Sequence, residues 1–133
     1  MLYDVQHTGL NVPASQAFSY IADPQKLPQW TNAFVSVDEH GHATLVTPEG
    51  QVDILLDVVS DPDTGTIDWI MHFPDGSTGT AYSRVIRLTA DTCAYSFTLT
   101  PPPVQLEQLE GALAAQSEIL AQELLRLKAQ LED

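Results

Sequence analysis

The C-terminal part of the chain limits the possible folds more than any other feature. After three consecutive prolines at 101–103, apolar residues recur every three or four positions from Leu106 to Leu131. This spacing is that of one face of an α-helix, and no proline interrupts it. A helix over Val104–Leu131 would be about 42 Å long, at about 1.5 Å per residue. Because such a helix has one apolar face to bury, we expect it to lie on a large curved sheet.

The segment between residues 34 and 100 has a hydrophobic period of two, which is typical of β-strands with one buried face. Short turns rich in Gly, Pro and Asp separate the strands, so neighbouring strands should be antiparallel. One more strand precedes them, followed by a helix N-capped by Ser15 and a helical turn at Leu27–Trp30. The predicted strands are Leu2–Val12, Phe34–Val37, His42–Val46, Val52–Val58, Ile67–Phe73, Thr78–Leu88 and Cys93–Thr100. The pattern predicts an α+β fold in which a seven-stranded antiparallel sheet curves around the long helix, with two short helices after strand 1.

Composition narrows the classes of function. The 133 residues fit a single domain, 1–133, with the 44% hydrophobic content of a globular chain. Five Lys and Arg against 18 Asp and Glu give a net charge of −13, which repels nucleic-acid phosphates and anionic membranes. No apolar run approaches the roughly 20 residues that cross a bilayer, and no signal peptide is evident. We therefore expect a cytoplasmic protein with no nucleic-acid partner and no membrane insertion.

Hairpin geometry predicts which side chains of the strands face the helix. If residues 74–77 form a four-residue loop, Phe73 pairs with Thr78 across the hairpin. Because side chains alternate along a strand, Tyr82 and Arg84 then lie on the same inner face as Phe73.

The next hairpin is consistent with this register. A four-residue loop at Thr89–Thr92 pairs Leu88 with Cys93. Tyr95 and Phe97 then point inward too, which puts the apolar side of that strand toward the helix.

An inward Arg84 would be costly in apolar surroundings unless its charge were paired. Its partner would be a carboxylate of the protein, or an acidic or carbonyl group of a ligand; a head group reaching solvent at the rim is the structural alternative. A register slip of one residue would instead place Val85 and Arg87 inside, and the sequence leaves that alternative open.

The predicted ligand cavity lies between the sheet and the long helix. Its predicted lining is Trp30, Trp69, Met71, Phe73, Tyr82, Arg84, Tyr95, Phe97 and Gln116. Trp30 and Trp69 are suited to stacking on a flat ligand, although filling the core is the simpler role of a large aromatic residue. Gln116 interrupts the leucine face of the helix and could offer a hydrogen bond in mid-cavity.

No catalytic motif is present, so the catalytic residues stay unassigned. Only Tyr82, Arg84 and His7 are candidates for acid–base or positioning roles. The His40-Gly41-His42 sequence resembles a metal motif, but its two histidines would project to opposite sides of a strand. A zinc site needs three or four ligands, so we predict no metal and no cofactor.

Residues 12–30 resemble the opening of SRPBCC (START-like) domains, often described as polyketide cyclase/dehydrase proteins. The resemblance lies in Val12-Pro13-Ala14-Ser15, in Ile21-Ala22-Asp23-Pro24 and in Leu27-Pro28-Gln29-Trp30. The order of elements and the closing helix match over essentially the whole chain. The resemblance implies the helix-grip fold, with a cavity between sheet and helix. Such domains include lipid and hormone binders, coenzyme-Q-binding proteins and aromatase/cyclases, without a shared catalytic motif.

In the cyclase members, pocket arginine and aromatic hydroxyl groups hold a polyketide, and Arg84 and Tyr82 are the positions here that match this pattern. The first hypothesis is therefore a binding protein for a hydrophobic or amphipathic small molecule, such as a lipid, quinone or polyketide-like compound. The second is a cofactor-independent cyclase or dehydratase acting in the same cavity. The third is an interaction domain that uses the outer sheet face or the acidic side of the helix; the sequence leaves a homodimer open.

Overall fold

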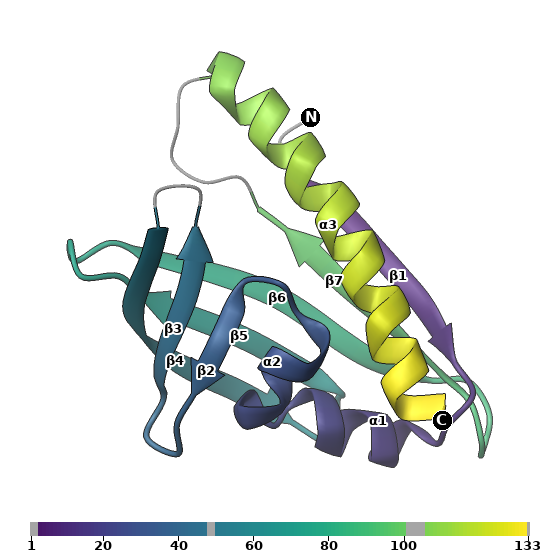
Figure 1. Ribbon diagram of the computed structural model, residues 1–133. Coiled ribbons are helices and arrows are strands. Elements are labelled where there is room, and N and C mark those ends of the chain that lie inside the picture. The colour runs from purple at the N-terminus through teal and green to yellow at the C-terminus, as the bar shows by residue number, and fades with distance from the viewer. Residues whose placement is uncertain (1–2, 48–49, 101–105, 133) are drawn as a thin grey trace.

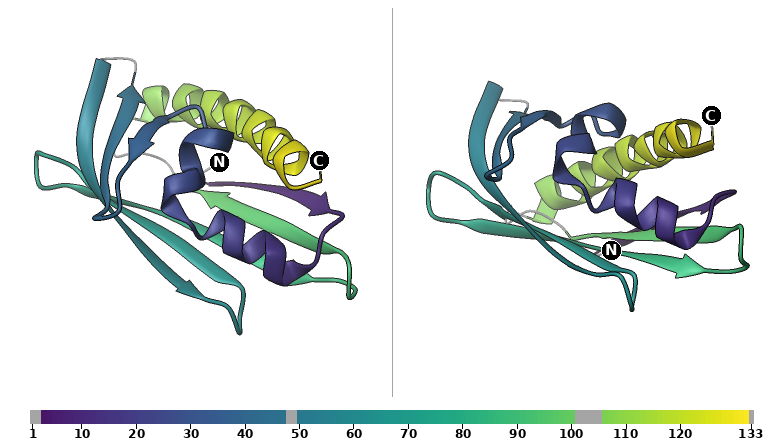
Figure 2. Two further views of the ribbon diagram at one scale, coloured as in Figure 1. Left: turned by 60° about the horizontal axis from the view of Figure 1, so that its bottom comes forward. Right: turned by 90° about the horizontal axis from the view of Figure 1, so that it is seen from below.

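The fold is a single curved sheet with all helices on one side of it (Figures 1 and 2). The computed structural model describes residues 3–47, 50–100 and 106–132, and the side chains of the last helix from Ser117 onward. Its strands are β1 (Asp4–Leu10), β2 (Phe34–Val37), β3 (His42–Thr47), β4 (Gly50–Asp61), β5 (Thr66–His72), β6 (Thr78–Arg87) and β7 (Cys93–Leu99). Its helices are α1 (Ala14–Ile21), a 3-10 turn at Pro24–Lys26, α2 (Leu27–Trp30) and α3 (Leu106–Glu132). The predicted α+β architecture is confirmed.

The seven strands follow the order β1-β7-β6-β5-β4-β3-β2, and every neighbouring pair is antiparallel. The strand that opens the chain therefore pairs with the last strand, and β1 and β2 form the two edges. The long helix α3 packs along β1 and against α2, so it covers one side of the inner face (Figure 1). Strands β4, β3 and β2 form the other end of the sheet.

Helix α1 begins two residues earlier than the sequence predicted. Its N-cap is Pro13, whose carbonyl accepts a hydrogen bond from the amide of Ala17 at 3.1 Å. Ser15 lies inside the first turn and does not cap it. A proline is tolerated at a helix start because the first amides have no intrahelical partner.

The β5–β6 hairpin differs from the predicted one in a way that changes the candidate site. The amide of Gly76 donates to the carbonyl of Phe73 at 3.0 Å, and the amide of Phe73 donates to the carbonyl of Ser77 at 2.9 Å. Gly76 has φ +88°, the left-handed conformation of a three-residue loop that ends in a glycine bulge. The predicted four-residue loop is therefore wrong, and His72 rather than Phe73 pairs with Thr78.

The β6–β7 hairpin contains the same one-residue difference. Leu88 donates its amide to the carbonyl of Thr92 at 3.1 Å, so Arg87 and not Leu88 pairs with Cys93. The two differences cancel in β7, whose predicted inner face is correct. They do not cancel in β6, where every side chain lies on the face opposite to the prediction.

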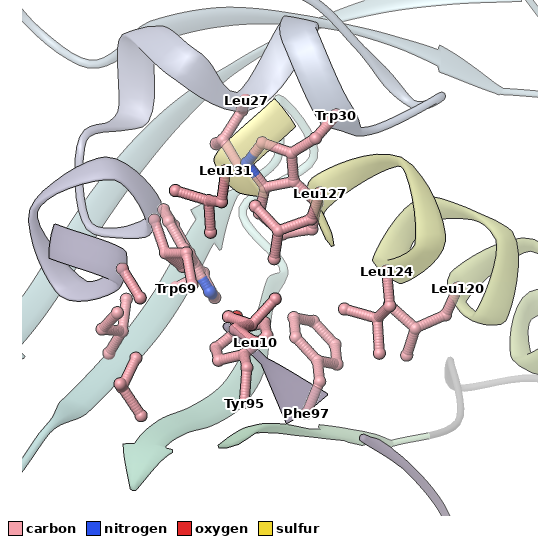
Figure 3. Packing of buried hydrophobic residues seen from close by; sticks show 14 of the residues in the cluster. Leu10, Leu27, Trp30, Trp69, Tyr95, Phe97, Leu120, Leu124, Leu127 and Leu131 are labelled. Atoms are coloured by element: carbon pink, nitrogen blue, oxygen red, sulfur yellow. The ribbon is translucent and has the colours of Figure 1, made fainter. Parts of the chain in front are cut away.

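The core fills the base of the space between sheet and helices (Figure 3). Leucines 120, 124, 127 and 131 of α3 are all buried, as the spacing predicted. They meet Leu10 of β1, Leu27 and Trp30 of α2, and the aromatic residues of β5 and β7. The leucines of α3 before residue 117 lie outside the described side chains.

Candidate functional site

Four of the predicted cavity residues come together at the base of the inner face (Figure 3). Trp30 and Trp69 are 1% and 4% exposed, Tyr95 is fully buried, and Phe97 is 9% exposed. The ring of Tyr95 meets Trp30 edge to face with centroids 6.3 Å apart, and it meets Phe97 similarly at 6.4 Å. These aromatic residues thus fill the core and also define the deep end of the predicted site.

Arg84 and Tyr82 do not belong to this group, so the prediction that they face the helix is wrong. Tyr82 is 48% exposed on the outer face, and Arg84 is exposed with its Nε donating to the carbonyl of Thr64 at 2.9 Å. The glycine bulge shifts β6 by one residue, which turns both side chains outward. Val85 lies on the inner face, as the alternative register with a slip of one residue predicted, and it is 5% exposed. Arg87 is exposed at the strand end, although it pairs with buried Cys93.

Two further residues of the predicted site, His7 and Gln116, remain to be placed. His7 is exposed on β1, where it pairs with Ser96 on the outer face. None of the three residues predicted to handle protons therefore reaches the inner face. Gln116 lies outside the described side chains, and its proposed role stays a prediction.

Beyond the aromatic base, the inner face continues over β2–β5 as an apolar surface. We call this surface the apolar wall, and its members are half-buried residues that pack against the edge of the core: Phe34, Val37, Val52, Val58, Met71 and Phe73. Met71 pairs with buried Leu56 and Val58 pairs with Trp69, so the wall is continuous with the base. Met71 and Phe73 were predicted in the cavity, and they lie on this wall.

Within the described residues, three buried polar atoms at the base form no hydrogen bond of good geometry: Nε1 of Trp30, Nε1 of Trp69 and the hydroxyl oxygen of Tyr95. We call them the polar trio. The indole nitrogen of Trp69 is turned toward the hydroxyl of Tyr95 (Figure 3). Burial raises the pKa of Tyr95, and hydrogen bonding with the side chains of Ser83 and Trp69 opposes this rise. Buried polar groups almost always have partners, and the hydroxyl oxygens of Tyr95 and Ser83 can accept hydrogen bonds as well as donate them.

Ser83 is the one buried polar residue next to the polar trio among the residues described. Its hydroxyl donates to the carbonyl of Ile67 at 2.6 Å, so its hydrogen is already used. The register shift that turned Arg84 outward brought Ser83 inward, and the sequence reasoning missed it. Only a correct loop length for the β5–β6 hairpin could have revealed it.

A second polar group lies on the inner face, where β1 meets α3. Gln6 Nε2 donates to Asp4 Oδ2 at 2.7 Å and to Ser117 Oγ at 2.9 Å, and the Ser117 hydroxyl also donates to Asp4. The hydrogen bonds from Ser117 and Gln6 lower the pKa of Asp4, which therefore stays ionised at neutral pH. The alternating polar residues of β1 were a signal for this group that the sequence reasoning did not use.

The charged residues elsewhere leave the base without a cation. All five Lys and Arg lie in the described part of the chain, and none of them is buried. Lys128 donates to the carbonyl of Gly9 at 2.9 Å and pairs with Glu132 at 2.5 Å. Glu123 of α3 is half-buried and accepts a hydrogen bond from the amide of Asn32 at 3.0 Å, and burial raises its pKa.

A hollow of about 770 Å³ lies over β2–β5 and is lined by His42 and His72 of the outer face as well as by Val37 and Phe73 of the apolar wall. His42 lies 3.2 Å from Asp38, and His72 lies 2.8 Å from Asp57. No group of three or more His, Cys, Asp or Glu side chains in the described residues is placed to hold a metal ion. In the same residues, no helix is long and apolar enough to cross a bilayer.

The architecture defines the class of fold. The chain has a seven-stranded antiparallel curved sheet, with two short helices after β1 and a long C-terminal helix. This arrangement is the helix-grip fold of START-like proteins. The resemblance seen in residues 12–30 is confirmed at this level. No model of a known protein family matches the chain, and no curated protein matches its sequence.

Solved structures resemble the chain over nearly its whole length. Protein XoxI from Bacillus cereus has a TM-score of 0.72 at 17% identity, covering 100% of this chain and 97% of that chain. The Zhui aromatase/cyclase from Streptomyces sp. R1128 has a TM-score of 0.75 at 14% identity, covering 98% and 93%. A START superfamily protein from Mycobacterium smegmatis has a TM-score of 0.66 at 13% identity, covering 98% and 97%. At these identities the likeness concerns the fold.

Proposed function

We propose that this protein binds a hydrophobic small molecule on the apolar wall, with the deep end of the ligand at the aromatic base. The observation that carries the proposal is the incomplete burial of the wall, since apolar side chains on the inner face of a sheet are normally covered. Ligand sites are typically concave and apolar with a few polar groups that fix orientation. The polar trio supplies such groups at the base.

The comparisons support the same class of function. A START superfamily protein and an aromatase/cyclase share the fold, and both names fit a role in handling small molecules. We place binding before the cyclase or dehydratase alternative because the predicted acid–base candidates Tyr82, Arg84 and His7 lie on the outer face. A cytoplasmic location, a homodimer and the absence of nucleic-acid binding stay predictions.

Met71 offers a direct test of the binding site. The chain has two methionines, so the methyl signal of Met71 in protein labelled with ¹³C-methyl methionine reports on the wall with almost no overlap. Titration with 2-ethylnaphthalene, an apolar probe without hydrogen-bonding groups, should shift this signal in a saturable way. A Met71 signal that stays unchanged up to the solubility limit of the probe would contradict the proposal.

Two adjacent valines of β4 provide matched variants. Val58 is half-buried on the wall, whereas Val59 is 54% exposed on the outer face. Val58→Asp should weaken probe binding at least about tenfold, because a carboxylate on the wall must be desolvated when the probe binds. Val59→Asp adds the same charge on the other side of the sheet and should leave the affinity unchanged.

A further inference from the structure

The outer face of the sheet carries a continuous row of side chains that the proposed ligand site does not use. Cross-strand pairing places Val5, Thr98, Tyr82, Asp68 and Val59 side by side on five adjacent strands. We call these five residues the outer row. Its apolar members are well exposed, at 43% for Val5, 48% for Tyr82 and 54% for Val59. The described helices all lie on the other side of the sheet, so the row faces solvent (Figure 2).

Asp68 is the unusual member of the outer row. It is half-buried and pairs with Tyr82 on one neighbouring strand and with Val59 on the other. Within the described part of the chain, its carboxylate accepts no hydrogen bond and forms no ion pair. Arg84, two residues beyond Tyr82 on β6, instead donates its Nε to the carbonyl of Thr64 at 2.9 Å. The row therefore holds an unpaired negative charge between two exposed apolar side chains.

A partner that covers the outer row must bring a positive charge to Asp68. An apolar or acidic surface placed there would bury an unpaired carboxylate, which costs free energy. Arginine suits the position because its planar head can form two hydrogen bonds to a carboxylate and can also stack on an aromatic ring. The ring of Tyr82 lies next to Asp68 in the row and supplies the surface for such a cation–π contact.

The charge of the chain argues against a second copy as the occupant. Asp57 and Asp61 flank Val59 on β4 and, by alternation, lie on the same face. Two such faces brought together would place these carboxylates near one another, in chains that each carry a net charge of −13. The same charges attract a basic surface.

The length of the outer row indicates a peptide segment. Five adjacent strands span about 19 Å, which is the length of about five to six residues of extended chain. We propose that the outer row docks a basic protein segment, which places an arginine against Tyr82 and Asp68 and apolar side chains on Val5 and Val59. This surface is separate from the proposed small-molecule site, because the two lie on opposite faces of the sheet.

Three peptides with one framework test the proposal. Their sequence is acetyl-Leu-Ser-X-Ser-Leu-amide, where X is arginine, its neutral isostere citrulline, or glutamate. The backbone amide signals of Asp68, Tyr82 and Thr98 in a ¹⁵N-correlated NMR spectrum report on the outer row. The arginine peptide should shift them in a saturable way and bind at least about fivefold more tightly than the citrulline peptide, through the added ion pair and cation–π contact. The glutamate peptide should leave them unchanged.

Variants separate recognition by the outer row from attraction to the net charge. Asp68→Asn should remove the preference for arginine over citrulline. Asp91→Asn is the matched control, since it removes one negative charge from the exposed loop between β6 and β7 and should leave the preference intact. Tyr82→Ser should weaken the binding of both peptides, because the ring that they cover is lost.

Three results would overturn the proposal. The first is the absence of a saturable shift at the outer row up to the solubility limit of the arginine peptide, or equal binding of the arginine and citrulline peptides. The second is a preference that Asp91→Asn reduces as much as Asp68→Asn, because net charge alone would then explain it. The third is a doubled mass in solution that Tyr82→Ser returns to that of one chain, since the outer row would then join two copies.

Discussion

The buried hydroxyl of Tyr95 leads to an unusual prediction, namely that its removal stabilises the ligand-free protein. Tyr95 is fully buried, and its hydroxyl forms no hydrogen bond of good geometry. Leaving a buried polar group unpaired costs about 1–3 kcal/mol. Tyr95→Phe removes this cost and leaves a void smaller than a methyl group, which costs less than about 1 kcal/mol. The net expectation is a gain of about 1 kcal/mol in the free energy of unfolding.

Urea unfolding followed by circular dichroism at pH 7 measures this gain. The protein should first be unfolded and refolded, so that any ligand carried from the expression host is removed. A gain of about 1 kcal/mol corresponds to about 4 °C in Tm for a chain of this size. Tyr82→Phe is the control, because a change at a residue that is 48% exposed should alter stability by less than about 0.5 kcal/mol.

The opposite result would be informative. A loss of about 1 kcal/mol or more in Tyr95→Phe, with Tyr82→Phe unchanged, would show that the hydroxyl has a partner in the ligand-free protein. Ser83, Trp69 or a buried water molecule would be that partner. The expected gain in stability, which depends on an unpaired hydroxyl, would then be refuted.

Two further predictions concern positions outside the site. Gly65→Ala should destabilise the protein by more than about 3 kcal/mol, because Gly65 has φ +76° and a Cβ there would lie 2.0 Å from a backbone carbonyl oxygen of β6. Gly76→Ala, at φ +88° but with open space around it, should cost only about 1–2 kcal/mol, and equal losses in thermal unfolding of the two variants would refute the argument. Burial raises the pKa of Glu123, so the folded state favours the neutral carboxyl. The folded protein is therefore stabilised by this group below the carboxyl's unfolded pKa, and it loses that stabilisation as pH rises through the folded pKa. Glu123→Gln keeps an oxygen for the Asn32 amide and should therefore raise Tm at pH 7, with a gain that shrinks as pH falls. The gain should exceed that of the control Glu118→Gln, on the exposed side of α3. A lower Tm for Glu123→Gln would contradict this reasoning.

Much of the fold could be predicted because hydrophobic period is a local property of the chain. The leucine spacing that ends at Leu131 predicted α3 to within two residues at its start and one at its end. The alternation around Trp69 and Tyr95 identified the inner faces of β5 and β7, and both residues are buried. These assignments needed no knowledge of loop geometry, since each strand or helix carried its own pattern.

The face of β6 could not be assigned in the same way. Its sequence, with Tyr82, Arg84 and Ile86 on one side and Ser83 and Val85 on the other, has no decisive alternation. The prediction therefore depended on counting residues through two loops. Each loop is one residue shorter than assumed, and a slip of one residue moves every side chain of a strand to the other face.

The sequence by itself determined the order of elements, the buried side of α3 and the aromatic base, because the spacing of apolar residues indicates which face of each element is buried. Only the tertiary structure decided what chemistry that base can perform. The conformation of one glycine, Gly76, sets the register of β6, and that register places Arg84 in solvent and Ser83 beside Tyr95. The packing of α2, β5 and β7 then leaves Trp30, Trp69 and Tyr95 as buried donors without a cation. Such a juxtaposition depends on contacts between distant segments, and no local pattern encodes it.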